Sequence, residues 1–331
     1  MKVNISKNYI QIARGRLVCF PNVSIVKFLA FLLCALVFYS QMSSANEDIP
    51  IWPGANSGKN KVVDFSKNST VPNRAITRVS SPNFIYVPPK VHNNHTAILI
   101  VPGGGFSYIM KDLEGLRVAD YLSQRGYSSF VLIYRMPKGG SDENRNNAFS
   151  DVQRSLRKIR SMSVNNEISI NKVGVMGFSA GAYLAANVSN KPNENYGHNN
   201  DAIDRLSARP DFTALIYPVI SMKTGITHQG TRQALYGKST SQQIGNEFSQ
   251  ENLVSKQTPP TFIAQALDDK VASPQNSLLM FDALRKMRVN VELHLFHEGG
   301  HGFSTGAGKT TPVSDWLDLF CKWQQSIDNA T

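Results

Sequence analysis

A serine between glycines at residues 177–181 is the pattern in this chain that most clearly predicts chemistry. The sequence reads Gly-Phe-Ser-Ala-Gly, with Ser179 at its centre. A short apolar run at residues 173–176 precedes it, and a run of helix-forming residues at 182–186 follows. A serine on such a tight strand-to-helix turn has an exposed hydroxyl, and the glycines permit close backbone approach on both sides. The pattern predicts that Ser179 is a nucleophile; the alternative is a glycine-rich turn that happens to contain a serine.

The serine needs a base that removes its proton, and this base is usually a histidine oriented by a carboxylate. His301 stands in Glu-Gly-Gly-His-Gly-Phe just after an expected strand at residues 291–296, and its glycine neighbours let the loop bend over the sheet edge. His294 lies between two leucines inside that strand and is interpreted as a packed or surface residue. Asp268 and Asp269 both follow the preceding expected strand, so either carboxylate has the position to orient the imidazole. The other aspartate then holds its own loop.

Acyl transfer also needs hydrogen-bond donors for the negative charge that develops on the carbonyl oxygen. Pro-Gly-Gly-Gly-Phe at residues 102–106 follows an apolar run, and its glycines leave the backbone amides unobstructed. We predict an oxyanion hole formed by the amides of Gly104, Gly105 and Ala180. The sequence has no metal-ligand spacing, phosphate loop or dinucleotide fingerprint, so the expected mechanism uses no metal and no cofactor.

The elements that must position these residues alternate along the chain. Buried strands are expected at residues 96–101, 129–134, 173–176, 212–219, 261–266 and 291–296. Helices are expected at residues 112–125, 148–162, 274–288 and 312–326, besides the one after Ser179. Such alternation predicts a mostly parallel central sheet with helices on both faces, a three-layer α/β sandwich. Together with the chain order serine, acid, histidine, it indicates the α/β-hydrolase fold.

The remaining segments carry coarser expectations. Residues 46–82 are rich in polar residues and proline and are expected to wrap the surface, and residues 83–87 read as an edge strand. The polar segments 190–209 and 221–258 are expected to line the rim above the site. The basic face of the helix at residues 148–162 is interpreted as solvated.

The first 45 residues predict a secretory signal peptide. They contain five basic residues and no acidic residue, then an apolar run at residues 28–39, and they end in Ser-Ser-Ala. The run is shorter than the roughly 20 residues of a membrane span. We expect cleavage after Ala45, with an uncleaved anchor as the alternative, and a secreted or periplasmic protein without stable membrane association once the signal is removed.

The rest of the chain, residues 46–331, has the length of one α/β domain with a full core. The formal net charge of the 331 residues is +11, and no basic block appears, so nothing supports binding to nucleic acid. Of the three cysteines only Cys321 lies after Ala45, which excludes an internal disulfide from the expected mature chain. The oligomeric state is not indicated.

Ordered motifs through most of this region give the chain a family resemblance. They are Ile-Trp-Pro-Gly at 51–54, Val-Pro-Gly-Gly-Gly-Phe at 101–106, Asp-Leu-Glu-Gly at 112–115, Tyr-Arg-Met-Pro at 134–137, Gly-Phe-Ser-Ala-Gly at 177–181, Arg-Pro-Asp-Phe at 209–212, Tyr-Pro at 217–218, Pro-Pro-Thr-Phe at 259–262, Asp-Asp at 268–269, Asn-Ser at 276–277 and Gly-Gly-His-Gly-Phe at 299–303. The chain resembles the secreted bacterial acetyl xylan esterase-like α/β-hydrolases, near the BD-FAE and hormone-sensitive-lipase-like esterases.

The resemblance implies a choice between the two aspartates. In the family pattern the catalytic aspartate lies eight positions before the serine of the Asn-Ser pair, which selects Asp269 from Ser277. Glu114 matches a family glutamate near the oxyanion loop, and a structural hydrogen bond is favoured over substrate contact. Ala182, Ala272 and Ser273 depart from the common family pattern, but none of them is a reacting group.

The resemblance further implies a serine esterase that removes acetyl groups from a carbohydrate such as xylan or its oligomers. A feruloyl esterase or a general short-chain carboxylesterase is the alternative among enzymes. A catalytically silent carbohydrate-binding member of the fold is the alternative from another class, and the complete triad argues against it. A peptidase of related fold would usually need an additional propeller domain, for which the chain has no room.

Overall fold

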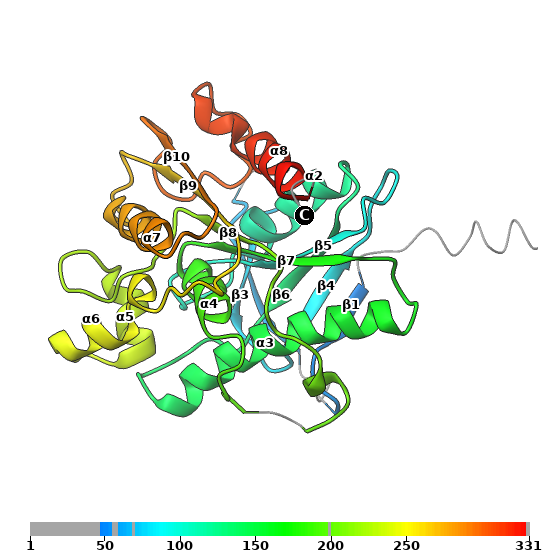
Figure 1. Cartoon of the computed structure of the whole chain (residues 1–331), viewed down its shortest axis with the longest axis horizontal. Coiled ribbons are helices and arrows are strands. Elements are labelled where there is room, and N and C mark those ends of the chain that lie inside the picture. Colours follow the sequence, from blue (N-terminus) through cyan, green and yellow to red (C-terminus); the bar gives the residue numbers. More distant parts are fainter. Residues whose placement is uncertain (1–46, 55–58, 68–69, 198–199, 329–331) are drawn as a thin grey trace, which may run out of the picture. The chain divides into compact units, whose positions relative to one another are not determined.

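The computed structural model describes residues 47–54, 59–67, 70–197 and 200–328 (Figure 1). The expected signal peptide lies outside the described residues. The chain from Asn46 onward forms one compact unit. None of the helices in the described part is both long and apolar enough to span a membrane.

Eight strands form the central sheet, in the order β1-β4-β6-β5-β7-β8-β9-β10. Their bounds are β1 Glu47–Pro50, β4 Asn83–Val87, β5 Thr96–Val101, β6 Ser128–Ile133, β7 Lys172–Phe178, β8 Thr213–Ile216, β9 Thr261–Ala266 and β10 Val291–Phe296. From β6 to β10 in this order all neighbours are parallel, whereas β4 is antiparallel to β1 and β6. The predicted mostly parallel α/β-hydrolase sheet is confirmed.

Helices cover both faces of this sheet. Figure 1 shows α2 (Arg117–Ser123) and α8 (Trp316–Asp328) on one face, and α3 (Asp142–Val164) and α4 (Ala180–Asn190) on the other. All residues of β5, β6, β8 and β9 are buried as a result. This explains why their sequences read as continuous apolar runs rather than as alternating ones.

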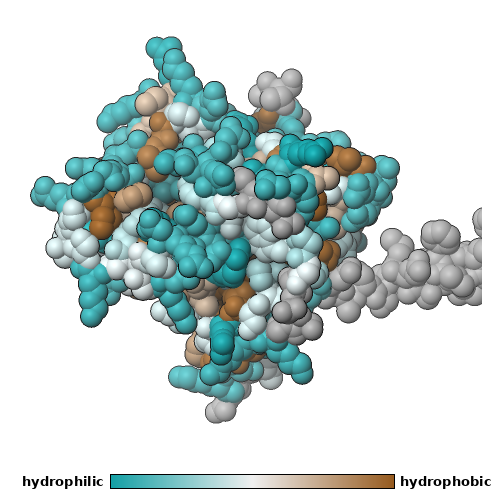
Figure 2. Space-filling model, turned by 90° about the horizontal axis from the view of Figure 1, so that it is seen from below, coloured by the Kyte–Doolittle hydropathy of each residue, from teal (hydrophilic) through white to brown (hydrophobic). Residues whose placement is uncertain are grey.

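Shorter elements complete the described part of the chain. The remaining α-helices are α5 Gln229–Tyr236, α6 Gln242–Phe248 and α7 Gln275–Lys286. A separate antiparallel pair is formed by β2 Lys61–Asp64 and β3 Arg74–Arg78. The single turns are η1 Lys111–Leu116, η2 Ile203–Arg205, η3 Gln250–Asn252 and η4 Pro312–Asp315. The face seen in Figure 2 is mainly hydrophilic, and its apolar side chains are scattered rather than gathered in one broad patch, which is ordinary for a protein surface.

Strand β1, not β4, forms the edge of the sheet on this side. The expectation that residues 83–87 form an edge strand is therefore wrong. β1 pairs antiparallel with β4, with Glu47 opposite Tyr86 and Pro50 opposite Asn83. A strand as short as β1 that ends in proline is a common way to close a sheet. Its sequence, Glu-Asp-Ile-Pro, has no apolar alternation. For this reason the sequence pattern suggested only a surface segment there.

Helix α3 begins at Asp142 rather than at residue 148 as expected. Ser141 caps its N-terminus, because the Ser141 hydroxyl accepts a hydrogen bond from the amide of Asn144. The first turns carry only polar residues, so the apolar spacing from which the helix was predicted starts later in the sequence.

The expectation that the basic face of α3 is solvated is also wrong. Arg154 is only 1% exposed. Its guanidinium donates hydrogen bonds to Asp201 at 2.6 Å and to Asp204 at 2.8 Å, and its Nε donates to the Ile51 carbonyl at 2.9 Å. Arg157 is buried beside it. These carboxylates come from a segment fifty residues away, which no pattern within the helix reveals.

The described part of segment 190–209 therefore packs along α3, and the expectation that it lines the rim of the site is wrong. Gln153 Nε2 donates to carbonyl oxygens of this segment, including that of Glu194 at 3.0 Å. Arg160 donates to the Arg209 carbonyl at 2.8 Å. The segment begins where α4 ends, about 16 Å along the helix axis from the Ser179 end. Its polarity predicts exposure but not which end of the sheet it lies near.

Candidate active site

Ser179 occupies the turn between β7 and α4 in a strained backbone conformation. Its φ and ψ angles are 50° and −119°, a combination that residues with a side chain rarely adopt. Gly181 lets the following helix come close, because a Cβ atom there would lie 2.2 Å from the carbonyl oxygen of Val101. The strand-to-helix turn that the sequence predicts is thus present, and it places the serine at the carboxyl end of β7.

Three side chains that are far apart in the sequence meet at this end of the sheet. Ser179 Oγ lies 2.9 Å from His301 Nε2, and His301 Nδ1 lies 2.7 Å from Asp269 Oδ2. Since an ionised carboxylate only accepts hydrogen bonds, Nδ1 of the neutral ring donates and Nε2 accepts from the serine hydroxyl. His301 follows β10 and Asp269 follows β9, so the topology itself brings them together. This series of hydrogen bonds is the arrangement in which an imidazole takes a proton from serine.

The structure separates the roles of the two adjacent aspartates. Asp269 is buried, and its second oxygen accepts hydrogen bonds from the amides of Val271 at 2.8 Å and Ala272 at 2.9 Å. Asp268 is exposed and accepts from the amide of Gly300 at 2.7 Å. One carboxylate thus faces the imidazole of His301, while the other holds the backbone beside it.

The charge of Asp269 is maintained against its burial. Burial raises the pKa of this carboxyl, but hydrogen bonding and charge interaction with His301, together with the amides of Ala272 and Val271, outweigh burial and hold the pKa below its ordinary value. The carboxylate therefore stays ionised throughout the neutral range, as the orientation of the imidazole requires.

The glycine loop after β5 lies directly against the nucleophile. A Cβ atom on Gly103 would come within 2.8 Å of Ser179 Cβ, so only glycine fits there. Gly104 and Gly105 have φ angles of 123° and 61°. Among the described residues, the amides of Gly104, Gly105 and Ala180 donate no hydrogen bond, so these three donors remain available to a ligand. The loop thus lies where an oxyanion hole is required, and the sequence prediction had not singled out Gly103 as its contact with the serine.

Glu114 fixes this loop from inside the protein. It lies in η1, a π-helical turn that takes the place of the first part of the helix expected at residues 112–125. The side chain is buried, and its Oε2 accepts a hydrogen bond from the Gly103 amide at 2.7 Å. Its Oε1 accepts from the hydroxyl of Tyr217 at 3.0 Å. This is a structural hydrogen-bonding position, as the sequence comparison with the family had favoured.

Tyr217 is a residue of the site that the sequence analysis missed. It follows β8 with a φ angle of 36°, which ends the strand earlier than the expected residue 219. Its buried ring stands edge-on to His301, with ring centres 5.0 Å apart, and to Phe303 at 4.5 Å. Tyr217 thus links the imidazole to Glu114 and, through it, to the glycine loop. Its place at the carboxyl end of a buried parallel strand was the available signal.

Segment 221–258 lies beside the site, where the sequence placed it. His228 of this segment precedes α5 and lies against the glycine loop: its ring carbon Cε1 is 3.4 Å from the point where a Cβ atom on Gly105 would stand. His228 was not among the predicted site residues. A lone histidine in a polar, mostly helical segment gives no signal of its own.

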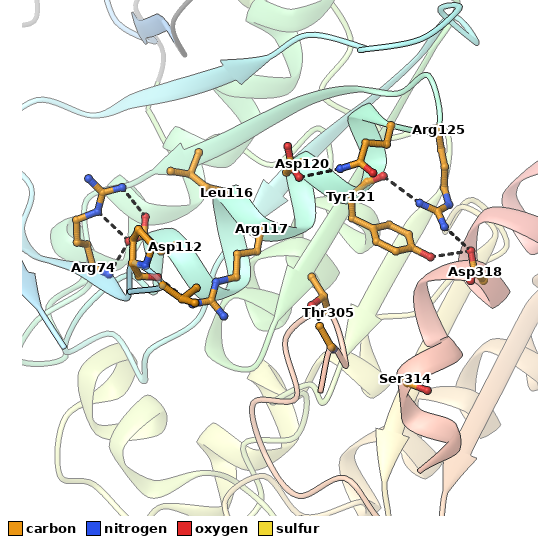
Figure 3. A pocket seen from close by; sticks show the side chains of 14 residues that line it. Arg74, Asp112, Leu116, Arg117, Asp120, Tyr121, Arg125, Thr305, Ser314 and Asp318 are labelled. Carbon is orange, nitrogen blue, oxygen red and sulfur yellow. Dashed lines mark hydrogen bonds and ion pairs between the residues drawn. The ribbon is translucent and has the colours of Figure 1, made fainter. Parts of the chain in front are cut away.

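The described surface also contains a groove of about 630 Å³ that lies apart from the triad (Figure 3). It runs along α2 and past the start of α8. Its acidic groups are already paired: Asp112 with Arg74, Asp120 with Lys90, and Asp318 with both Arg125 and the Tyr121 hydroxyl. Nowhere in the described ranges do three or more histidine, cysteine or acidic side chains gather as metal ligands.

Comparison with known proteins places this geometry in a family. The model of the BD-FAE family matches residues 84–284. The chain is 33% identical over 214 residues to an acetylxylan esterase of Xylanibacter ruminicola, and 32% identical over 218 residues to an endo-1,4-beta-xylanase B of Butyrivibrio fibrisolvens. These matches cover 63% and 65% of this chain, but only 41% and 34% of the relatives, so the chain corresponds to less than half of either protein.

Solved structures match this chain over nearly their full lengths, unlike the two relatives above. The acetyl ester-xyloside bifunctional hydrolase of Caldicellulosiruptor lactoaceticus superposes with a TM-score of 0.69 at 30% identity, covering 86% of this chain and 97% of that one. A carboxylesterase of Lactobacillus plantarum superposes with a TM-score of 0.60 at 19% identity, covering 82% of this chain and 98% of its own, and supports the fold alone.

Proposed function

Because this chain belongs to the BD-FAE family of α/β-hydrolases, we propose that it is a serine esterase that removes acetyl groups from a carbohydrate, of xylan or xylo-oligosaccharide type. The observation that carries the esterase chemistry is the hydrogen-bonded series from Ser179 through His301 to Asp269 beside three open amides. The substrate class is supported by the names of relatives that are acetylxylan esterase, xylanase and acetyl ester-xyloside hydrolase.

In the proposed reaction Ser179 Oγ attacks the acetyl carbonyl carbon, and His301 Nε2 takes the hydroxyl proton. The amides of Gly104, Gly105 and Ala180 donate to the oxyanion of the tetrahedral intermediate. His301 then gives its proton to the sugar oxygen, and the C–O bond breaks to leave an acetyl-serine. Water attacks the acetyl-serine with His301 again as base, which releases acetate and restores the hydroxyl. Asp269 keeps the ring oriented and stabilises the imidazolium in both halves.

The test follows acetate release by residues 46–331, the compact unit, beside the variant Ser179→Ala. The substrates are acetylated xylan, and 4-nitrophenyl acetate against longer-chain and feruloyl esters. We expect acetate from xylan with the intact protein and none with the variant.

The other outcomes identify the alternatives. Turnover of small or feruloyl esters without acetate release from xylan would identify a general carboxylesterase or a feruloyl esterase instead. Absence of hydrolysis with every ester would leave a carbohydrate-binding member of the fold. Equal activity of the variant would remove Ser179 from the proposal.

We propose that the protein is secreted or periplasmic, with residues 1–45 acting as a cleaved signal peptide. Mass spectrometry of the exported protein is expected to find an N-terminus at Asn46. A full-length product held in the membrane fraction would instead indicate an uncleaved anchor.

A further inference from the structure

His228 presents a defined protonation state beside the candidate active site. It caps the N-terminus of α5: its Nδ1 accepts a hydrogen bond from the amide of Thr231 at 3.2 Å and lies 2.9 Å from the Thr231 hydroxyl. Because Nδ1 accepts from a backbone N–H, the proton of the neutral ring must be on Nε2. Among the described residues Nε2 has no hydrogen-bond partner, so His228 offers one unused donor.

The ring of His228 lies against the glycine loop, beside the candidate active site. Cε1, the atom that joins the two ring nitrogens, lies 3.4 Å from the point where a Cβ atom on Gly105 would stand and 3.1 Å from the corresponding point on Gly230. Nε2 is bonded to Cε1, so the unused donor lies next to the glycine loop. Burial is the main cause that lowers the pKa of His228, and the charge of His301 lowers it further, while Asp269 acts in the opposite direction. The ring is therefore within electrostatic reach of both triad members, and it stays neutral near pH 7.

The proposed reaction indicates which part of the substrate lies near the Nε2–H donor of His228. The glycine loop and the nucleophile turn already supply three amides for the carbonyl oxygen of the ester. His301 must give its proton to the alcohol oxygen, so the alcohol part of the substrate lies next to His301. A sugar has hydroxyl and ring oxygens adjacent to that position, whereas a nitrophenyl group has no acceptor there.

Resting on the proposed deacetylase function, we infer that His228 Nε2–H donates a hydrogen bond to an oxygen of the sugar that carries the acetyl group. His228 is thereby a specificity-determining residue that favours a carbohydrate over a simple alcohol as the leaving group. Because the donor is neutral and lies on a helix cap held by Thr231, it is oriented before the substrate arrives.

Two variants separate the donor from the helix cap. In His228→Gln the amide nitrogen of the side chain can occupy the place of Nε2, but the cap is lost. In His228→Asn the side-chain oxygen can accept from Thr231 and keep the cap, but no donor reaches the site. Both variants and the wild type are assayed on an acetylated xylo-oligosaccharide and on 4-nitrophenyl acetate, with melting temperatures as the measure of the cap.

We expect kcat/KM of His228→Asn on the oligosaccharide to fall about tenfold, the effect of one hydrogen bond in a partly desolvated site, mainly through a higher KM. Turnover of 4-nitrophenyl acetate should stay within about twofold of wild type. His228→Gln should recover most of the oligosaccharide activity and show the lower melting temperature. An unchanged oligosaccharide activity in His228→Asn would overturn the inference and leave His228 a cap alone.

Equal losses of His228→Asn on both substrates would also overturn it, because the donor would then act on the acyl group. A wild-type protein that hydrolyses 4-nitrophenyl acetate but releases no acetate from the oligosaccharide removes the proposed substrate and the inference together. If the wild type hydrolyses both substrates and His228→Asn changes the two activities equally, only the inference about His228 is removed.

Discussion

Glu114 Oε2 lies 2.7 Å from the backbone nitrogen of Gly103, directly behind the candidate nucleophile. The same carboxylate accepts the Tyr217 hydroxyl, so one buried side chain connects the glycine loop with the ring that packs against His301. The positions of the oxyanion donors and of the base are therefore set by a shared group that need not touch the substrate.

Removal of this carboxylate is expected to disturb the site without removing a reacting atom. Glu114→Ala leaves the Gly103 amide and the Tyr217 hydroxyl buried without an acceptor, which costs about 1–3 kcal/mol for each unsatisfied group. We expect a lower free energy of unfolding in urea. We also expect a tenfold to hundredfold lower kcat on 4-nitrophenyl acetate, because a loss of about 1–3 kcal/mol in transition-state stabilisation corresponds to roughly that factor in rate. Glu114→Gln keeps an acceptor for Gly103 and should retain most of the kcat.

The charge of Glu114 also predicts a pH dependence of stability. Burial raises the pKa of Glu114 above its ordinary 4.5, more than the hydrogen bonds from Gly103 and Tyr217 and the charge of His301 lower it. The folded state then holds its proton over a pH range in which the unfolded chain has lost it, so this group destabilises the fold as pH rises from about 4.5 upward. The stability of Glu114→Gln relative to wild type should therefore increase with pH over that window. A difference that is constant from pH 4 to 8, measured by urea unfolding, would contradict the raised pKa.

Ser179 is expected to be needed for activity, whereas its backbone conformation should be more stable with glycine than with any residue that has a side chain. Ser179→Ala should lower kcat/KM by roughly 10⁴-fold or more and leave the fold intact, as circular dichroism can verify. Ser179→Gly should be equally inactive but more stable than the alanine variant by about 1–2 kcal/mol, because glycine adopts a φ of 50° without the strain. Melting temperatures of the two variants compare them directly. Equal stability would mean that this turn stores no strain.

The two neighbouring aspartates provide a matched pair. Asp269→Asn should lower kcat by about 10³–10⁴-fold, because the amide cannot hold the imidazole in its tautomer or stabilise its charge. Asp268→Asn keeps an acceptor for the Gly300 amide and should stay within about tenfold of wild type. Rates on 4-nitrophenyl acetate at saturation decide between them, and a larger loss in Asp268→Asn would reverse the assignment.

Arg154 is expected to be a stability determinant remote from the chemistry. Arg154→Met leaves Asp201 and Asp204 without the guanidinium they share, and breaking such a buried ion pair costs about 3–5 kcal/mol. The exposed pair of Lys90 with Asp120 is the control, and Lys90→Met should change the free energy of unfolding by less than about 1 kcal/mol. Urea titrations of both variants test the contrast, while kcat per folded molecule should remain at the wild-type level.

Sequence patterns predicted best where one element carries its own signal. The strands expected at residues 96–101 and 261–266 have those bounds in the structure, because a strand buried on both faces is apolar throughout. The strands expected at residues 83–87 and 291–296 also have their expected bounds, although both are only partly buried. The loops after β7, β9 and β10 supply Ser179, Asp269 and His301, and parallel strands bring their carboxyl ends to one edge. The elements, Ser179 and His301 could thus be read from local runs and chain order, whereas the choice of Asp269 over Asp268 needed the family resemblance.

Contacts between residues far apart in the chain could not be predicted from the sequence. The burial of Arg154 depends on carboxylates fifty residues away, and the role of Glu114 depends on a tyrosine 103 residues away. A charged residue on a helix reads as solvated unless its partner is known, because an unpaired buried charge would be too costly. The sheet edge was missed for a similar reason, since β1 is a strand only through its partner β4.

That last pairing has a consequence for how the protein is processed. β4 is an internal strand only while residues 47–50 lie beside it. Under the proposed cleavage after Ala45, one residue separates the cut from the first residue of β1. A protease that trims a few residues further would uncover the backbone of β4 as an open template for another chain. If residues 1–45 are removed as proposed, the position of the cut therefore also decides whether the backbone of β4 stays covered or is open to pairing with another chain.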